Sequence, residues 1–137
     1  MRAAKVLAVL AIAALGIGSF SAVALAAKKK KTAVIFFNQS PKIGKSGKVN
    51  AKGSLNTVSV CEPSRSMRLQ VLDVNGVVLT TLDGSTSDAS GNWTLSGQLP
   101  KTLPAGTNYV RVKAKKRTVG KFVCQAGVSP NVAIPAQ

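Results

Sequence analysis

Short segments in which apolar and polar residues alternate follow one another along residues 49–134. The clearest pair, Met67–Val74 and Val77–Leu82, flanks Asn75-Gly76, which is typical of a tight hairpin turn with positive φ at both positions. Alternation sends successive side chains of a strand to opposite faces of its sheet. The positions that we expect to face the core are Met67, Leu69 and Val71. The apolar residues Leu72 and Val74 indicate that the other face is also partly covered.

Further segments have the same strand pattern and are separated by turn residues. They are Val49–Leu55, Val58–Cys61, Asn92–Leu99, Asn108–Lys115 and Val128–Ile134, the last broken by Pro130. A turn at 88–91 delivers Trp93 onto its strand, with Leu95 and Gly97 on the same face. No helical periodicity is sustained over these residues. The pattern therefore predicts an all-β fold, an antiparallel β-sandwich of about seven strands.

The residues after 108 predict a final hairpin whose register depends on the length of its loop. Val110 and Val112 alternate with basic residues, so they point to the core while the basic side chains point outward. We expect Phe122 and Cys124 to lie beside these two valines. Directly opposite residues share a face, so this arrangement requires an odd-length loop centred on Lys116.

The beginning of the chain has the three parts of a secretory signal peptide, residues 1–26. A cationic start precedes the apolar run Val6–Phe20, and Ala24-Leu25-Ala26 places alanine at both positions that a signal peptidase reads. We expect cleavage after Ala26 and a secreted, periplasmic or cell-surface protein with no stable membrane span. The alternative is an uncleaved anchor, since Val6–Ala27 is long enough to cross a bilayer.

The chain after the signal peptide divides into two regions. Residues 27–48 are a basic N-terminal segment and linker, rich in lysine, glycine and serine, with a possible first strand at 33–37. Residues 49–137 are the β-sandwich domain. The mature chain of about 111 residues is long enough to build one core of modest size.

Cys61 and Cys124 are the only cysteines. In an exported chain two cysteines favour one disulfide. The alternative is a pair of free thiols, but the sequence has no histidine to activate either of them. A bridge between residues 63 positions apart would stabilise the fold by roughly 4 kcal/mol on the chain-entropy estimate.

Positive charge is the dominant feature of the composition. The chain has 19 lysine and arginine residues against 4 acidic residues, a net charge of +15. Without Arg2 and Lys5 the mature chain has 17 against 4, a net charge of +13. Such a charge favours anionic partners such as cell-envelope polymers or lipid headgroups. The alternative is that the charge only keeps the protein soluble and needs no partner.

The basic residues fall into a tail at 28–31, a linker set at 42–52 and a hairpin set. The hairpin set is the candidate anion-binding site, and its members are Arg111, Lys113, Lys115, Lys116, Arg117 and Lys121. No aromatic residues interleave with this set, so we do not expect specific nucleic-acid binding. The alternative interpretation is a solvated outer face of the sheet.

The sequence offers little for catalysis. It has no histidine, and its four acidic residues are Glu62, Asp73, Asp83 and Asp88. Each aspartate lies beside turn residues, where aspartate caps the local backbone. The alternative is a calcium site, because Asp83, Asp88 and Asn92 offer oxygen ligands close together in the sequence. We expect a non-enzymatic protein with no cofactor and no metal site.

The order of these segments resembles bacterial Ig-like and carboxypeptidase-regulatory-like (prealbumin-like) domains of secreted proteins, over roughly residues 49–126. In those families an Asp-x-x-Gly-aromatic turn leads into a strand, and a Pro-Gly turn leads into a Tyr-x-Val strand. The matching residues are Asp88, Gly91, Trp93, Pro104, Gly106, Tyr109 and Val110. Unlike in antibody domains, the tryptophan lies midway between the two cysteines.

The resemblance implies an adhesive, spacer or accessory module with no catalytic residues to carry over. We therefore expect an exported structural or interaction module at the cell envelope or outside the cell, whose partner the sequence leaves open between an anionic envelope polymer and another envelope protein. The alternative is a cationic module that binds anionic envelope polymers or lipid headgroups through residues 111–121.

Overall fold

The computed structural model describes residues 30–37 and 39–136, so the signal peptide predicted for residues 1–26 lies outside the described residues. The described part is all-β, with eleven strands and one short 3-10 helix, η1 (Ser59–Cys61). The strands are β1 (Lys31–Ala33), β2 (Lys42–Ile43), β3 (Lys48–Ser54), β4 (Ser66–Leu72), β5 (Val78–Thr86), β6 (Asn92–Gln98), β7 (Tyr109–Ala114), β8 (Arg117–Val119), β9 (Phe122–Cys124), β10 (Gly127–Val128) and β11 (Val132–Ala133). The excess over the expected seven comes from strands of two or three residues, which are too short to show alternation.

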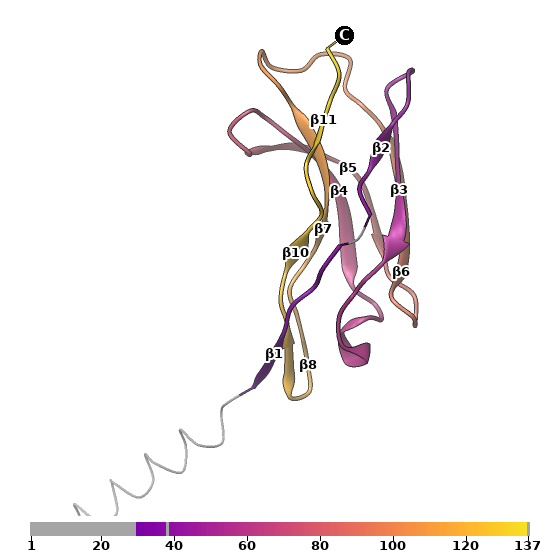
Figure 1. Ribbon diagram of the computed structural model, residues 1–137, viewed down its shortest axis with the longest axis vertical. Helices are drawn as coiled ribbons and strands as arrows, with labels where there is room; N and C mark the ends of the chain where they lie inside the picture. Colours follow the sequence, from indigo (N-terminus) through magenta and orange to yellow (C-terminus); the bar gives the residue numbers. More distant parts are fainter. Residues whose placement is uncertain (1–29, 38, 137) are drawn as a thin grey trace, which may run out of the picture. The chain divides into compact units, whose positions relative to one another are not determined.

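Two antiparallel sheets form the main layers (Figure 1). One has the order β10-β7-β4-β5, with β11 also paired to β7, and the other has the order β2-β3-β6. Inward side chains of both sheets belong to one hydrophobic cluster, which makes the arrangement sandwich-like. Asp83 links the two layers, because its carboxylate accepts hydrogen bonds from the backbone N–H of Gly84 in β5 and of Ser96 in β6.

The alternation in the sequence correctly identifies the core. Met67, Leu69 and Val71 of β4 are fully buried, and Trp93 of β6 is only 4% exposed. Leu72, on the other face of β4, is also fully buried, so the expectation that both faces of this strand are partly covered is confirmed. Burying each of these large apolar side chains stabilises the fold by roughly 1.5–3 kcal/mol.

The hairpin between β4 and β5 forms as expected, but its turn differs from the predicted type. Asp73 N–H donates to Val77 O and Gly76 N–H donates to Asp73 O, which makes a loop of residues 74–76. Among the residues of this loop only Gly76 has positive φ, at 80°. The Asp73 carboxylate stabilises the turn by accepting from the N–H groups of Asn75 and Val77, and this cap explains why the loop is longer than two residues.

The segment expected to be a linker is part of the same compact unit as the sheets, which starts at Lys31 rather than near Val49. β1 pairs in parallel with β9 and ends at Ala33 instead of continuing to Phe37. Ile35 is nevertheless buried in the core. Phe37 packs edge-to-face on Trp93, with ring centroids 5.9 Å apart. Ile35 and Phe37 therefore contribute to the core from outside the main sheets, whereas Val34 and Phe36 are exposed.

The predicted final hairpin between 108–115 and 122–124 is wrong. β7 pairs with β4 on one edge and with β10 and β11 on the other, so no edge is left for β9. β8 and β9 instead form a separate hairpin that turns at Gly120, whose φ is 55°, and Lys121. Cys124 packs with Ala33 and Cys61 in a small second cluster. The expected edge strand broken by Pro130 is present as β10 and β11.

Within residues 30–37 and 39–136, no helix has the length and apolar character needed to span a membrane.

Candidate anion-binding surface

The disulfide between Cys61 and Cys124 joins η1 to β9, as the sequence predicts, with Cα atoms 5.6 Å apart. Both cysteines are fully buried. The bridge attaches the β8–β9 hairpin to the loop that enters β4. This hairpin carries several of the candidate anion-binding residues, so the disulfide fixes their position on the fold.

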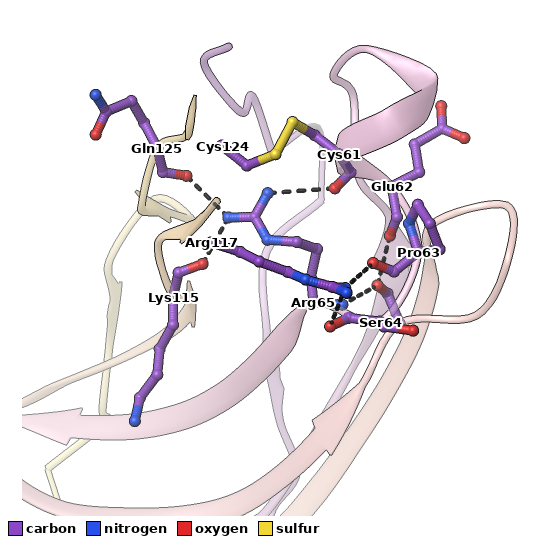
Figure 2. The surroundings of a disulfide bond; sticks show 10 residues. Cys61, Glu62, Pro63, Ser64, Arg65, Lys115, Arg117, Cys124 and Gln125 are labelled. Atoms are coloured by element: carbon purple, nitrogen blue, oxygen red, sulfur yellow. Dashed lines mark hydrogen bonds between the residues drawn. A yellow bond between two sulfur atoms is a disulfide. The ribbon is translucent and has the colours of Figure 1, made fainter. Parts of the chain in front are cut away.

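A fully buried arginine, Arg65, reinforces the same junction (Figure 2). Its guanidinium donates from Nη1 to Cys61 O at 3.2 Å, and from Nη2 to Lys115 O at 2.6 Å and Gln125 O at 2.9 Å. Lys115 and Gln125 are the points where the chain leaves the main sheet and returns from the β8–β9 hairpin. Arg65 therefore holds together the two ends of the segment that contains the β8–β9 hairpin, and three carbonyl dipoles compensate its buried charge.

Burial, and then the positive charge of Arg117, lower the pKa of Arg65 below its usual value of 12.5. The group remains a cation at neutral pH because arginine starts from so high a value. Arg65 is not among the site residues predicted from the sequence. A signal was present, since Arg65 continues the inward series of Met67, Leu69 and Val71 at every second position.

A second arginine pins the first strand of the hairpin (Figure 2). Arg117 Nη1 donates to Pro63 O at 2.9 Å and to Ser64 O at 3.0 Å. Ser64 has positive φ, 54°, which turns the backbone just before β4. With the disulfide and Arg65, this is the third connection between the β8–β9 hairpin and residues 61–65.

The structure brings together basic residues that the sequence analysis assigned to separate sets. Pairing of β1 with β9 places Lys31, the last residue of the tail, beside the hairpin: Lys31 N–H donates to Lys121 O at 2.9 Å, and Lys31 Nζ lies 5.9 Å from the centre of the Phe122 ring. We call the resulting surface the basic end. Its members are Lys31, Lys115, Lys116, Arg117 and Lys121, all of them exposed.

The other two candidates, Arg111 and Lys113, lie apart from the β8–β9 hairpin on the outer face of β7. Their cross-strand neighbours on β4 are Gln70 and Arg68. Arg111 Nε donates to Gln70 Oε1 at 3.1 Å, so part of its hydrogen-bonding capacity already belongs to the sheet. The six predicted residues therefore divide between a strand face and the basic end.

Asp73 and Asp88 cap turns, as the turn interpretation predicts, but the turn expected at Asp83 is absent because this residue lies within β5. Asp73 caps the β4–β5 loop and Asp83 links β5 to β6. Asp88 accepts from the N–H groups of Ser90 and Asn92 and from the Asn92 amide. The hydrogen bond from Asn92 N–H lowers the pKa of Asp88 against an opposing desolvation, and the hydrogen bonds from Ser90 N–H and the Asn92 side chain lower it further. In the described part of the chain, no three acidic or thiol side chains gather into a metal-ligating group.

No protein family model, curated protein or solved structure matches this chain. The arrangement itself indicates what chemistry the basic end can perform. Its ammonium and guanidinium groups can donate to oxyanions and attract them by charge. The aspartate carboxylates, which could neutralise these cations, instead accept hydrogen bonds from backbone N–H groups of turns and strands.

Proposed function

We propose that this chain is an exported, non-enzymatic β-sandwich module of the Ig-like or prealbumin-like type that acts at the cell envelope by binding an anionic polymer at the basic end. The observation that carries the proposal is the gathering of Lys31, Lys116 and Lys121, from two distant parts of the sequence, on one surface. Concentrated positive charge raises the local density of anionic ligands and their rate of association.

The attachment of the basic end supports this role. The disulfide, Arg65 and Arg117 each connect the short β8–β9 hairpin to residues 61–65. A hairpin of two three-residue strands has little stability of its own. Holding it in place lowers the ordering cost that a ligand would otherwise have to offset, so its lysines are preorganised for binding.

Export and the absence of catalysis rest on separate observations. The pattern of residues 1–26 favours secretion, and a buried disulfide is compatible with an extracellular location. The lack of histidine and the engagement of Asp73, Asp83 and Asp88 with backbone N–H groups favour a binding role over an enzymatic one. A protein partner in the envelope is the second candidate, consistent with the adhesive and accessory modules that the order of strands resembles.

A matched pair of charge reversals tests the basic end. Lys116→Glu with Lys121→Glu changes the net charge as much as Lys45→Glu with Lys101→Glu, and all four lysines are exposed. A lysine near an anionic surface contributes about 1 kcal/mol, so the first variant should bind inorganic polyphosphate at least about tenfold more weakly than the second. Equal losses in the two variants would show that only net charge matters.

Export is tested by mass spectrometry of the protein recovered outside the cytoplasm. We expect a chain that begins at Ala27 and contains no free thiol. A chain that still contains residues 1–26 would favour the uncleaved anchor, and two free thiols would contradict a disulfide-bonded exported protein.

A further inference from the structure

A groove of about 660 Å³ lies on the β2-β3-β6 sheet, where the segment that leads into β2 forms one wall. The wall is held in place because Pro41 is buried and Ile43 packs against the core. The groove is separate from the basic end, which is built from β1, β8 and β9. The residues that line it are Gln39, Ser40, Pro41, Lys42, Asn50, Ala51, Lys52, Thr94 and Leu95.

Strand register places the polar side chains of the groove on one face of the sheet. Lys42 of β2 is directly opposite Asn50 of β3, and Lys52, two positions further along β3, is directly opposite Thr94 of β6. All four residues are exposed. Strand spacings place the Cα atoms of Lys42 and Lys52 about 8 Å apart. Two ammonium groups thus border a floor that also carries an amide and a hydroxyl.

The fold leaves these groups free, although it engages amides elsewhere on the same face. Asn92 donates to the Asp88 carboxylate, and Gln98 donates to Ser46 O at 2.7 Å. Within the described residues, the side chains of Asn50, Lys52 and Thr94 have no hydrogen-bond partner. Their donors and acceptors are therefore available to a ligand.

We propose that this groove binds a carboxylated saccharide chain. Amide and hydroxyl groups can donate to and accept from sugar hydroxyls, and the two lysines attract carboxylates of the chain. The exposed stems of Lys42 and Lys52 supply apolar surface for the sugar rings. No arginine lines the groove, so it lacks the planar fork that suits bidentate phosphate recognition. The inference does not depend on polymer binding at the basic end.

A comparison of two lysines on one strand tests the proposal. Lys48 and Lys52 both lie on β3, point to the same face and are exposed, but only Lys52 lines the groove. We expect Lys52→Ala to weaken the binding of short alginate oligosaccharides about fivefold and Lys48→Ala to change it less than about twofold. Backbone amide shifts on titration with alginate oligosaccharides should centre on Asn50, Lys52 and Thr94.

Other outcomes would overturn the assignment. Equal effects of Lys48→Ala and Lys52→Ala would mean that alginate responds only to net charge. Neutral dextran oligosaccharides producing the same shifts would show that carboxylates are not recognised, and stronger shifts with short polyphosphate would show a phosphate site. Lys116→Glu with Lys121→Glu should leave the groove shifts unchanged, so a failure of the basic end is distinguishable from a failure of the groove.

Discussion

Replacing Arg65 with methionine should destabilise the protein more than any conservative change at the surface. The substitution keeps an unbranched apolar stem, shortens the side chain and removes every hydrogen-bond donor. Three carbonyl oxygens, those of Cys61, Lys115 and Gln125, would lose their interaction with the guanidinium. The question is whether this loss exceeds the benefit of no longer burying a charge.

The structure decides the sign of the effect. Hydrogen bonds to a charged group contribute roughly 1.5–3 kcal/mol each, and a buried carbonyl left without a donor costs about 1–3 kcal/mol. The opposing term is the desolvation of the guanidinium, which amounts to several kcal/mol. Because three carbonyls are affected, we expect a net loss of about 3–5 kcal/mol. That is about a third of the 5–15 kcal/mol typical of a domain.

Urea unfolding of the oxidised protein measures this loss, with Arg68→Met as the control. Arg68 lies three residues further along the chain, on the outer face of β4, and is partly exposed. We expect the control to change the free energy of unfolding by less than about 0.5 kcal/mol. If Arg65→Met cost less than about 1 kcal/mol at an unchanged m-value, the buried charge would be a net burden, and our account of the junction would be refuted.

Three further predictions concern the disulfide, the contact between β5 and β6, and one turn. Replacing Cys61 and Cys124 with alanine should lower the free energy of unfolding by about 4 kcal/mol, given their separation of 63 residues, and a loss under 1 kcal/mol in urea would contradict the entropic estimate. Gly97→Ala should lower the free energy of unfolding by about 1–3 kcal/mol in the same assay, because the added Cβ in β6 would lie 2.7 Å from the Cβ of Leu82 in β5. An unchanged urea midpoint would mean that β5 and β6 move apart there without cost. Folding lowers the pKa of Asp88. The Asp88 carboxylate therefore stabilises the folded protein above the pKa of an unfolded aspartate, roughly 3.9, and this stabilisation is lost as the pH falls through the folded-state pKa. NMR titration should give a midpoint below 3.8, and Asp88→Asn should flatten the loss of stability in acid.

Local pattern predicted the parts of the fold that depend on alternation. Leu69, Trp93 and Val112 point inward because each lies in a strand of six or seven residues, where the period of two is clear. The two cysteines identified the disulfide because no other pairing was possible within the chain. These inferences needed only the order of residues and the compartment.

Pairings between distant segments could not be predicted in the same way. The edge of β7 could accept β9 or the residues after it, and both contain apolar residues at suitable spacing. The structure selects the later residues: Ser129 N–H donates to Val112 O, and Ser129 Oγ accepts from Val112 N–H. This choice releases β9 to pair with β1. The basic end, which joins Lys31 to Lys121, is a consequence of that pairing.

The location of polyanion binding is the most direct test of the account. Titrating an isotopically labelled protein that begins at Ala27 with short inorganic polyphosphate and following its backbone amides by NMR would map the contact surface. The account predicts saturable shifts concentrated at Lys31 and at residues 115–121, which fade as salt is added because the attraction is electrostatic. Shifts spread evenly over the lysines of both sheets, or none at all at low salt, would contradict it.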